Sequence, residues 1–235
     1  MATSAKSDNM EICKTQDAFA LTLGNLPDLN NESLESGVAP ILVGLRALIP
    51  RWDTRTVSPR VLEYYLQTST FDNSANAELT KTLLQQAASS WNSVKCGVTF
   101  AAASDPKHAH FDVVYDKTGN DGATAMAFFP DAVDKVYIYP PAFDDPDTKK
   151  QLVNTFTHEL GHILGLRHEH ALELESNAVL IGMRNPDSIM GYNQSTRSLQ
   201  QSDREGLKKF YGFDNGVEID NVPIIDFEAV FLKRN

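Results

Sequence analysis

The chain is organised around one stretch, Gln151-Leu-Val-Asn-Thr-Phe-Thr-His-Glu-Leu-Gly-His-Ile-Leu-Gly-Leu-Arg-His168. Its apolar residues recur at three- and four-residue steps, which is the period of a helix with one buried face. They are Leu152, Phe156, Leu160, Ile163 and Leu164. On such a helix His158 and His162, four residues apart, project from one face about a turn apart. The stretch therefore predicts a helix that presents two imidazoles to a single metal ion.

The residues that follow predict a third ligand. Gly165 allows the chain to leave the helix through a turn with positive φ, and that turn can bring His168 round to the same metal. Three neutral nitrogen ligands with an open fourth position are typical of a catalytic zinc site rather than a structural one. Glu159 follows the first ligand and is placed to take a proton from a metal-bound water, as a general base does. The pattern predicts one catalytic Zn²⁺.

The alternative for this stretch is an amphipathic helix with chance histidines. That alternative has some weight for a bare H-E-x-x-H pattern. The complete H-E-x-x-H-x-x-G-x-x-H pattern, which runs from His158 to His168, is far more specific, so we favour the zinc site.

Composition limits the classes of partner. The 235 residues are 42% hydrophobic, enough to supply a core, and the formal net charge is −10. No cluster of Lys and Arg stands out, which argues against nucleic acid or an anionic membrane as the main partner. The longest apolar run, near Val38 to Ile49, is interrupted by Pro40 and Arg46 and is too short to span a bilayer. We expect no transmembrane segment.

Location and redox state stay open at this point. Residues 1–10 are polar and lack the apolar core of a signal peptide, so the chain is either intracellular or a secreted protein shown without its leader. The two cysteines, Cys13 and Cys96, either form one bridge or stay reduced. Nothing in the sequence indicates the oligomeric state.

The rest of the chain predicts an α+β domain with a mostly parallel sheet and two long helices. We expect strands at 61–67, 98–103, 111–115, 122–130 and 135–140, and helices at 76–94 and from about 146. The peptidase-like domain is expected at 51–213, after an N-terminal extension at 1–50 and before a tail at 214–235. Apolar residues 222–232 of this tail could add a strand. We interpret His108 and His110 as surface residues rather than as a second metal site.

Several downstream stretches carry a resemblance to the metzincin zinc endopeptidases, over about Trp52 to Gly212. Asp112-Val-Val-Tyr resembles the third strand of that family, and Ala125-Met-Ala-Phe-Phe-Pro is similar to the edge strand of its matrixin branch. Ser188-Ile-Met-Gly-Tyr resembles the Met-turn, and residues 198–212 resemble the closing C-terminal helix with its Tyr-Gly end. The chain is identified as a member of this superfamily.

The resemblance implies a metzincin-like, zincin-type fold: a five-stranded, mostly parallel, twisted sheet with an antiparallel edge strand, and a small C-terminal subdomain. It implies hydrolysis of internal bonds of a polypeptide. Met190 would form an apolar floor beneath the three imidazoles. Ala125, Ala127 and Phe128 would hold the substrate backbone by β-augmentation. Tyr192 would hydrogen-bond the tetrahedral intermediate.

The resemblance leaves the branch of the superfamily open. Tyr192 and the pair Glu169-His170 are astacin-like, whereas the Phe-Phe-Pro strand and the closing helix are matrixin-like. Matrixins bind a structural zinc through a histidine where this chain has Met126, so we expect no second zinc. In an inhibitory pro-segment Cys13 or Asp28 could lie on the zinc, but we favour a surface-packed arm.

Two other functions compete with a general endopeptidase. One is a narrow-specificity intracellular processing peptidase. The other is a non-catalytic module that keeps zinc for structure or binds a partner. The intact Glu159 disfavours the second, because a zinc-binding scaffold has no need of that carboxylate.

Overall fold

A computed structural model describes residues 41–45, 47–118, 122–174, 178–182, 184–191 and 198–233. Its central sheet has five strands in the order β4-β3-β5-β7-β6. They are β3 (Arg60–Leu66), β4 (Val98–Ala102), β5 (Phe111–Tyr115), β6 (Ala125–Met126) and β7 (Val136–Ile138). All neighbours are parallel except β6 and β7, which are antiparallel. The mostly parallel sheet with an antiparallel edge strand is confirmed.

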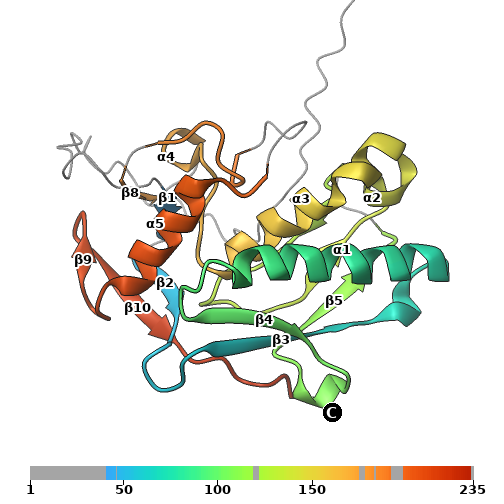
Figure 1. Ribbon diagram of the computed structural model, residues 1–235, viewed down its shortest axis with the longest axis horizontal. Helices are drawn as coiled ribbons and strands as arrows, with labels where there is room; N and C mark the ends of the chain where they lie inside the picture. The colour runs from blue at the N-terminus through green and yellow to red at the C-terminus, as the bar shows by residue number, and fades with distance from the viewer. Residues whose placement is uncertain are drawn as a thin grey trace, which may run out of the picture.

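Two long helices lie on the same side of this sheet (Figure 1). They are α1 (Ser74–Asn92) and α3 (Pro146–Ile163). Each helix is preceded by an N-cap residue whose side chain accepts a backbone N–H of the first turn. Asn73 accepts from Asn76, and Asp145 accepts from Thr148. Short elements complete this half: η1 (Thr68–Thr70), η2 (Pro106–His108), α2 (Pro141–Asp144) and α4 (Ala171–Leu174).

Two buried tryptophans donate hydrogen bonds to carbonyls of α3. Trp91 of α1 donates its indole N–H to the carbonyl of Thr157 at 2.7 Å. Trp52 donates to the carbonyl of Ile163 at 2.6 Å. Both indoles are at most 2% exposed. Because these carbonyls flank the turns that carry the first two histidines, the position of those turns is set by side chains from two other elements.

The segment before the sheet is part of the fold. Strand β1 (Ile41–Val43) pairs antiparallel with β8 (Val179–Ile181), which follows α4 in the chain. Strand β2 (Ile49–Trp52) pairs in parallel with β10 (Val222–Phe227), and β10 pairs with β9 (Glu218–Ile219). The extra strand expected in the tail is present, whereas the strands at 41–43 and 49–52 were not predicted. Residues 1–40 lie outside the described ranges.

Helix α5 (Gln201–Gly212) lies against β1 and next to β2 and β10 (Figure 1). The buried Arg51 connects β2 to β10 and to the C-terminal end of α5. Its guanidinium donates to Asp226 of β10 at 2.7 Å and to the carbonyls of Phe210 and Phe213, at 2.7 and 2.9 Å. The ion pair is almost fully buried, so removal of Asp226 would leave the charge of Arg51 in the core without its carboxylate partner.

His110 is buried at 8% exposure, so its assignment to the surface is wrong. The chain after β10 covers it: the ring of Phe231 lies 4.5 Å from the imidazole, and Leu232 donates its N–H to the Ala109 carbonyl. Nδ1 of His110 accepts the backbone N–H of Glu63 at 2.9 Å. This bond requires an unprotonated Nδ1.

His110 gives the fold a dependence on pH. Burial lowers the pKa of its imidazole, and the charge of Glu63 acts in the opposite direction. Since the folded-state pKa lies below that of the unfolded chain, the stabilisation is present above about pH 6.5 and is lost as the pH falls toward the folded-state pKa. We expect His110→Gln to reduce the difference between the unfolding free energies at about pH 7.5 and about pH 5.5. His108→Gln is the control; an equal reduction there would contradict the assignment to His110.

Among the described residues, no helix has both the length and the apolar content needed to cross a membrane.

Candidate metal centre and active site

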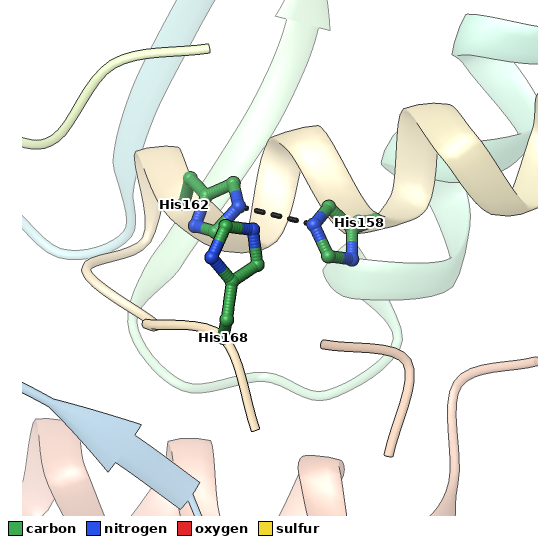
Figure 2. A group of neighbouring side chains, drawn as sticks. All are labelled: His158, His162 and His168. Carbon is green, nitrogen blue, oxygen red and sulfur yellow. Dashed lines mark hydrogen bonds between the residues drawn. The ribbon is translucent and has the colours of Figure 1, made fainter. Parts of the chain in front are cut away.

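The first two predicted ligands lie in the last turns of α3. His158 and His162 are 4% and 0% exposed, and their rings project from the same side of the helix (Figure 2). Their Nε2 atoms are 3.1 Å apart. Two nitrogens about 2.0–2.1 Å from one zinc at the tetrahedral angle would be about 3.4 Å apart. The observed separation fits a shared metal ion.

A Schellman motif ends this helix. The Gly165 N–H donates to the carbonyl of His162 at 2.8 Å, and the Leu166 N–H donates to that of Gly161 at 3.0 Å. Gly165 has a φ of 93°, in the left-handed region. A Cβ at this position would lie 2.5 Å from the Pro50 carbonyl oxygen. Only glycine therefore fits both the backbone angle and the approach of β2.

Backbone carbonyls orient the two helical imidazoles. Nδ1 of His158 lies 2.8 Å from the Ile189 oxygen, and Nδ1 of His162 lies 2.7 Å from the Leu166 oxygen. A carbonyl oxygen can only accept, so each Nδ1 carries the hydrogen and each Nε2 of a neutral ring presents a lone pair. Two lone pairs 3.1 Å apart repel unless a cation lies between them. The tautomers thus favour metal binding.

His168, in the segment after the Schellman motif, completes the cluster (Figure 2). One ligand nitrogen from each of the three histidines lies within 4.8 Å of the others. The His168 ring is 5.2 Å from that of His158 and 4.6 Å from that of His162. The ring of His170 stacks on that of His168, with centroids 5.0 Å apart and an interplanar angle of 12°. Three neutral, buried imidazoles form a donor set that suits zinc.

Glu159 is 1% exposed and follows His158 within α3. A carboxylate in such a desolvated place is costly unless a cation or proton is close. The three-imidazole cluster, two of whose members lie on the same helix, supplies the place for that cation. The arrangement can hold a proton acceptor beside a metal-activated water.

Met190 lies directly under the ligand helix. It is 3% exposed, and a Cβ added to Gly161 would be 2.5 Å from its sulfur and 3.3 Å from the indole of Trp91. Gly161 stands between Glu159 and His162, so the absence of a side chain there lets the Met-turn approach the helix.

We therefore expect Gly161→Ala to lower the free energy of unfolding by about 1–3 kcal/mol, since an added methyl overpacks this contact. Gly212→Ala is the matched control, because Gly212 is also helical and its Cβ would meet nothing within 4 Å. Urea unfolding of the zinc-free proteins measures both. A Gly161→Ala protein as stable as the Gly212→Ala protein would contradict the close contact.

Asp203 of α5 is a residue that the sequence did not single out. It is fully buried and accepts the Ser188 hydroxyl at 2.6 Å and the Ile189 N–H at 3.1 Å. The same Ile189 offers its carbonyl to His158. Asp203 therefore holds the peptide that orients the first ligand. One signal in the sequence could have identified Asp203. It is an acidic residue at the third position of the helix, where a capping box places its carboxylate.

Glu169 links the third ligand to the Met-turn. Its N–H donates to the Met190 carbonyl at 3.0 Å, and its carboxylate accepts the Asn185 N–H at 2.8 Å. Arg184 donates to the Glu169 carbonyl at 2.8 Å. Burial raises the pKa of the Glu169 carboxyl, and the bonds from Asn185 and Arg184 oppose the shift. These contacts fix the chain on both sides of the metal cluster.

The predicted substrate-contact residues lie at the sheet edge and just after it. Ala125 is in β6, while Ala127 and Phe128 follow that strand; all three side chains are at most 1% exposed. Contact with a substrate would therefore use their backbone. Met126 lies against the hydroxyl of Tyr139 at 3.9 Å. Tyr192 lies outside the described residues.

Comparison with known proteins gives a family match and a structural likeness. Residues 51–212 match the matrixin peptidase family. Among solved structures, the chain is similar to high choriolytic enzyme 1, a hatching enzyme zinc-protease from Oryzias latipes (Medaka fish). The two share 13% identity with a TM-score of 0.38, over 68% of this chain and 94% of that chain. No curated protein matches.

Proposed function

This chain belongs to the matrixin family of metzincins, and from that premise we propose that its three clustered histidines bind one catalytic zinc and that Glu159 is the general base. Family membership makes the protein a zinc metalloendopeptidase whose substrates are polypeptides. The observation that supports the residue assignment is the convergence of three buried imidazole nitrogens within 4.8 Å beside Glu159.

The reaction proposed is hydrolysis of an internal peptide bond. The zinc, when bound, supplies a Lewis acid that polarises the scissile carbonyl and acidifies the attacking water. Glu159 takes a proton from that water and delivers it to the nitrogen of the leaving amine. The burial of Glu159 excludes bulk water from this transfer, and Glu159 directly follows His158 in the ligand helix.

Substrate binding is proposed at the edge strand. Strand β6 is the last strand in the sheet order, and its inner side pairs with β7. Its outer side can pair with an extended substrate, and the backbone of Ala125, Ala127 and Phe128 would provide the hydrogen bonds. Tyr192 would donate its hydroxyl hydrogen to the oxyanion that forms on the scissile carbonyl.

Zinc removal tests this proposal. We expect a chelator to abolish cleavage of a proteome-derived peptide library and added zinc to restore it. Zinc should also stabilise the fold by about 4 kcal/mol at a free concentration about 1,000-fold above its Kd, because the metal binds the folded state only. Thermal unfolding with and without zinc measures this shift. Zinc binding without cleavage would favour a non-catalytic module, and cuts confined to one or two sequences would favour a processing peptidase.

A further inference from the structure

The N-terminal strand reaches the segment that carries the third ligand, although it precedes the matched region 51–212. Leu42 of β1 accepts the backbone N–H of Arg167 at 2.7 Å. The same strand pairs with β8, which lies between the third ligand and the Met-turn in the chain. A segment outside the matched region is thus built into this half of the site.

Arg167 is one of the largest fully buried side chains in the described residues, at 2% exposure. It donates from one terminal nitrogen to the Gly44 carbonyl at 3.0 Å. Its guanidinium carbon lies 5.4 Å from the centroid of the Phe129 ring. That ring meets His162 edge-on at 5.4 Å, with an interplanar angle of 71°. Arg167 therefore precedes one ligand in the chain and reaches a second through one aromatic ring.

These contacts make the guanidinium a rigid link. The carbonyls of Leu42 and Gly44 are held by a strand that pairs along Ile41–Val43, so they present fixed acceptors. A planar guanidinium that both donates to such an acceptor and stacks on a ring has little freedom left. Loss of the link would release the side chain that precedes His168 from the N-terminal strand and would remove the cation from the ring beside His162.

Resting on the zinc site proposed above, we propose that Arg167 is a positioning residue that transmits the geometry of the N-terminal strand to His162 and His168. The strand at 41–45 then belongs to the catalytic unit, and zinc affinity depends on it. Partners that orient ligands from outside the coordination sphere typically change metal affinity by about 10–100-fold.

The test compares zinc dissociation constants of the full chain by competition with a chromophoric chelator. Arg167→Met keeps the apolar length of the side chain, and we expect its zinc Kd to rise by about 10-fold or more. Arg167→Lys can still donate to the Gly44 carbonyl but lacks the planar group over Phe129, so its Kd should rise less.

Arg51→Met is the matched control. Arg51 is also buried, donates to backbone carbonyls and lies 5.8 Å from an aromatic ring, that of Phe210, but none of its contacts is a zinc ligand. Its replacement should lower the free energy of unfolding and leave the zinc Kd unchanged. Equal effects of the two Met variants on the zinc Kd would overturn the positioning role, as would an unchanged Kd for Arg167→Met.

If Arg167→Met does not fold, the zinc Kd of Phe129→Leu tests the positioning role instead. This substitution removes only the ring between the guanidinium and His162, and we expect a raised zinc Kd in a folded protein. An unchanged Kd there would overturn the link. Failure of the wild-type chain to bind zinc at all would instead overturn the metal site, and the positioning role with it.

Discussion

Glu159→Gln is expected to lower kcat/KM for peptide cleavage by about 10²–10⁴-fold, the range for loss of a general acid–base group. The amide has nearly the shape of the carboxylate but cannot take a proton from water. Because Glu159 is not one of the three clustered imidazoles, zinc should remain bound. Cleavage of a fluorogenic peptide and metal content measure the two effects separately.

Glu78→Gln controls for the loss of one negative charge. Glu78 is exposed on α1, where it pairs with Lys81. The Glu78→Gln protein should cleave the peptide with the same kcat/KM as the wild type. A Glu159→Gln protein that keeps zinc and cleaves at the normal rate would show that another group accepts the proton.

Gly165→Ala is expected to lower the free energy of unfolding by about 2–5 kcal/mol. A φ of 93° costs a residue with a Cβ roughly 1–2 kcal/mol, and overpacking typically adds about 1–3 kcal/mol. The overpacking arises because the Cβ would lie 2.5 Å from the Pro50 oxygen, an atom of the backbone that cannot rotate away. Zinc affinity should fall too, since the turn at Gly165 carries Leu166 to the imidazole of His162.

Gly216→Ala separates the two contributions. Gly216 also has a positive φ, 84°, but its Cβ would meet nothing within 4 Å. The free energy of unfolding of Gly216→Ala should fall only by the cost of the positive φ, roughly 1–2 kcal/mol. Urea unfolding of both variants without zinc gives the comparison. Equal losses would mean that the chain near Pro50 shifts to admit the methyl.

The predictions from sequence succeeded where the chemistry is local. The spacing of His158 and His162 on one helix, and the turn at Gly165, are properties of one continuous stretch. The five strands of the central sheet, the edge strand at 125–126 among them, follow from short patterns of the same kind. The matrixin match also decides between the branches that Tyr192 and the Phe-Phe-Pro strand had left open.

What the sequence did not show depends on contacts between distant segments. The pairing of Leu42 with Leu180 joins residues far apart, and no periodicity in either stretch names its partner. The run Ile41-Leu-Val43, treated as part of an extension, is apolar enough for a buried strand and was the available signal. Arg167 and Asp203 were missed because their types are usually exposed, and burial is decided by what packs over them.

The buried bond between Arg51 and Asp226, 175 residues apart, bears on the timing of synthesis. During translation β2 leaves the ribosome before β10, the strand that completes its pairing and neutralises Arg51. Such a long-range contact cannot form until β10 has also been made. A nascent chain that already carries all three imidazoles but not β10 still lacks the strand that pairs with β2 and the carboxylate that pairs with Arg51.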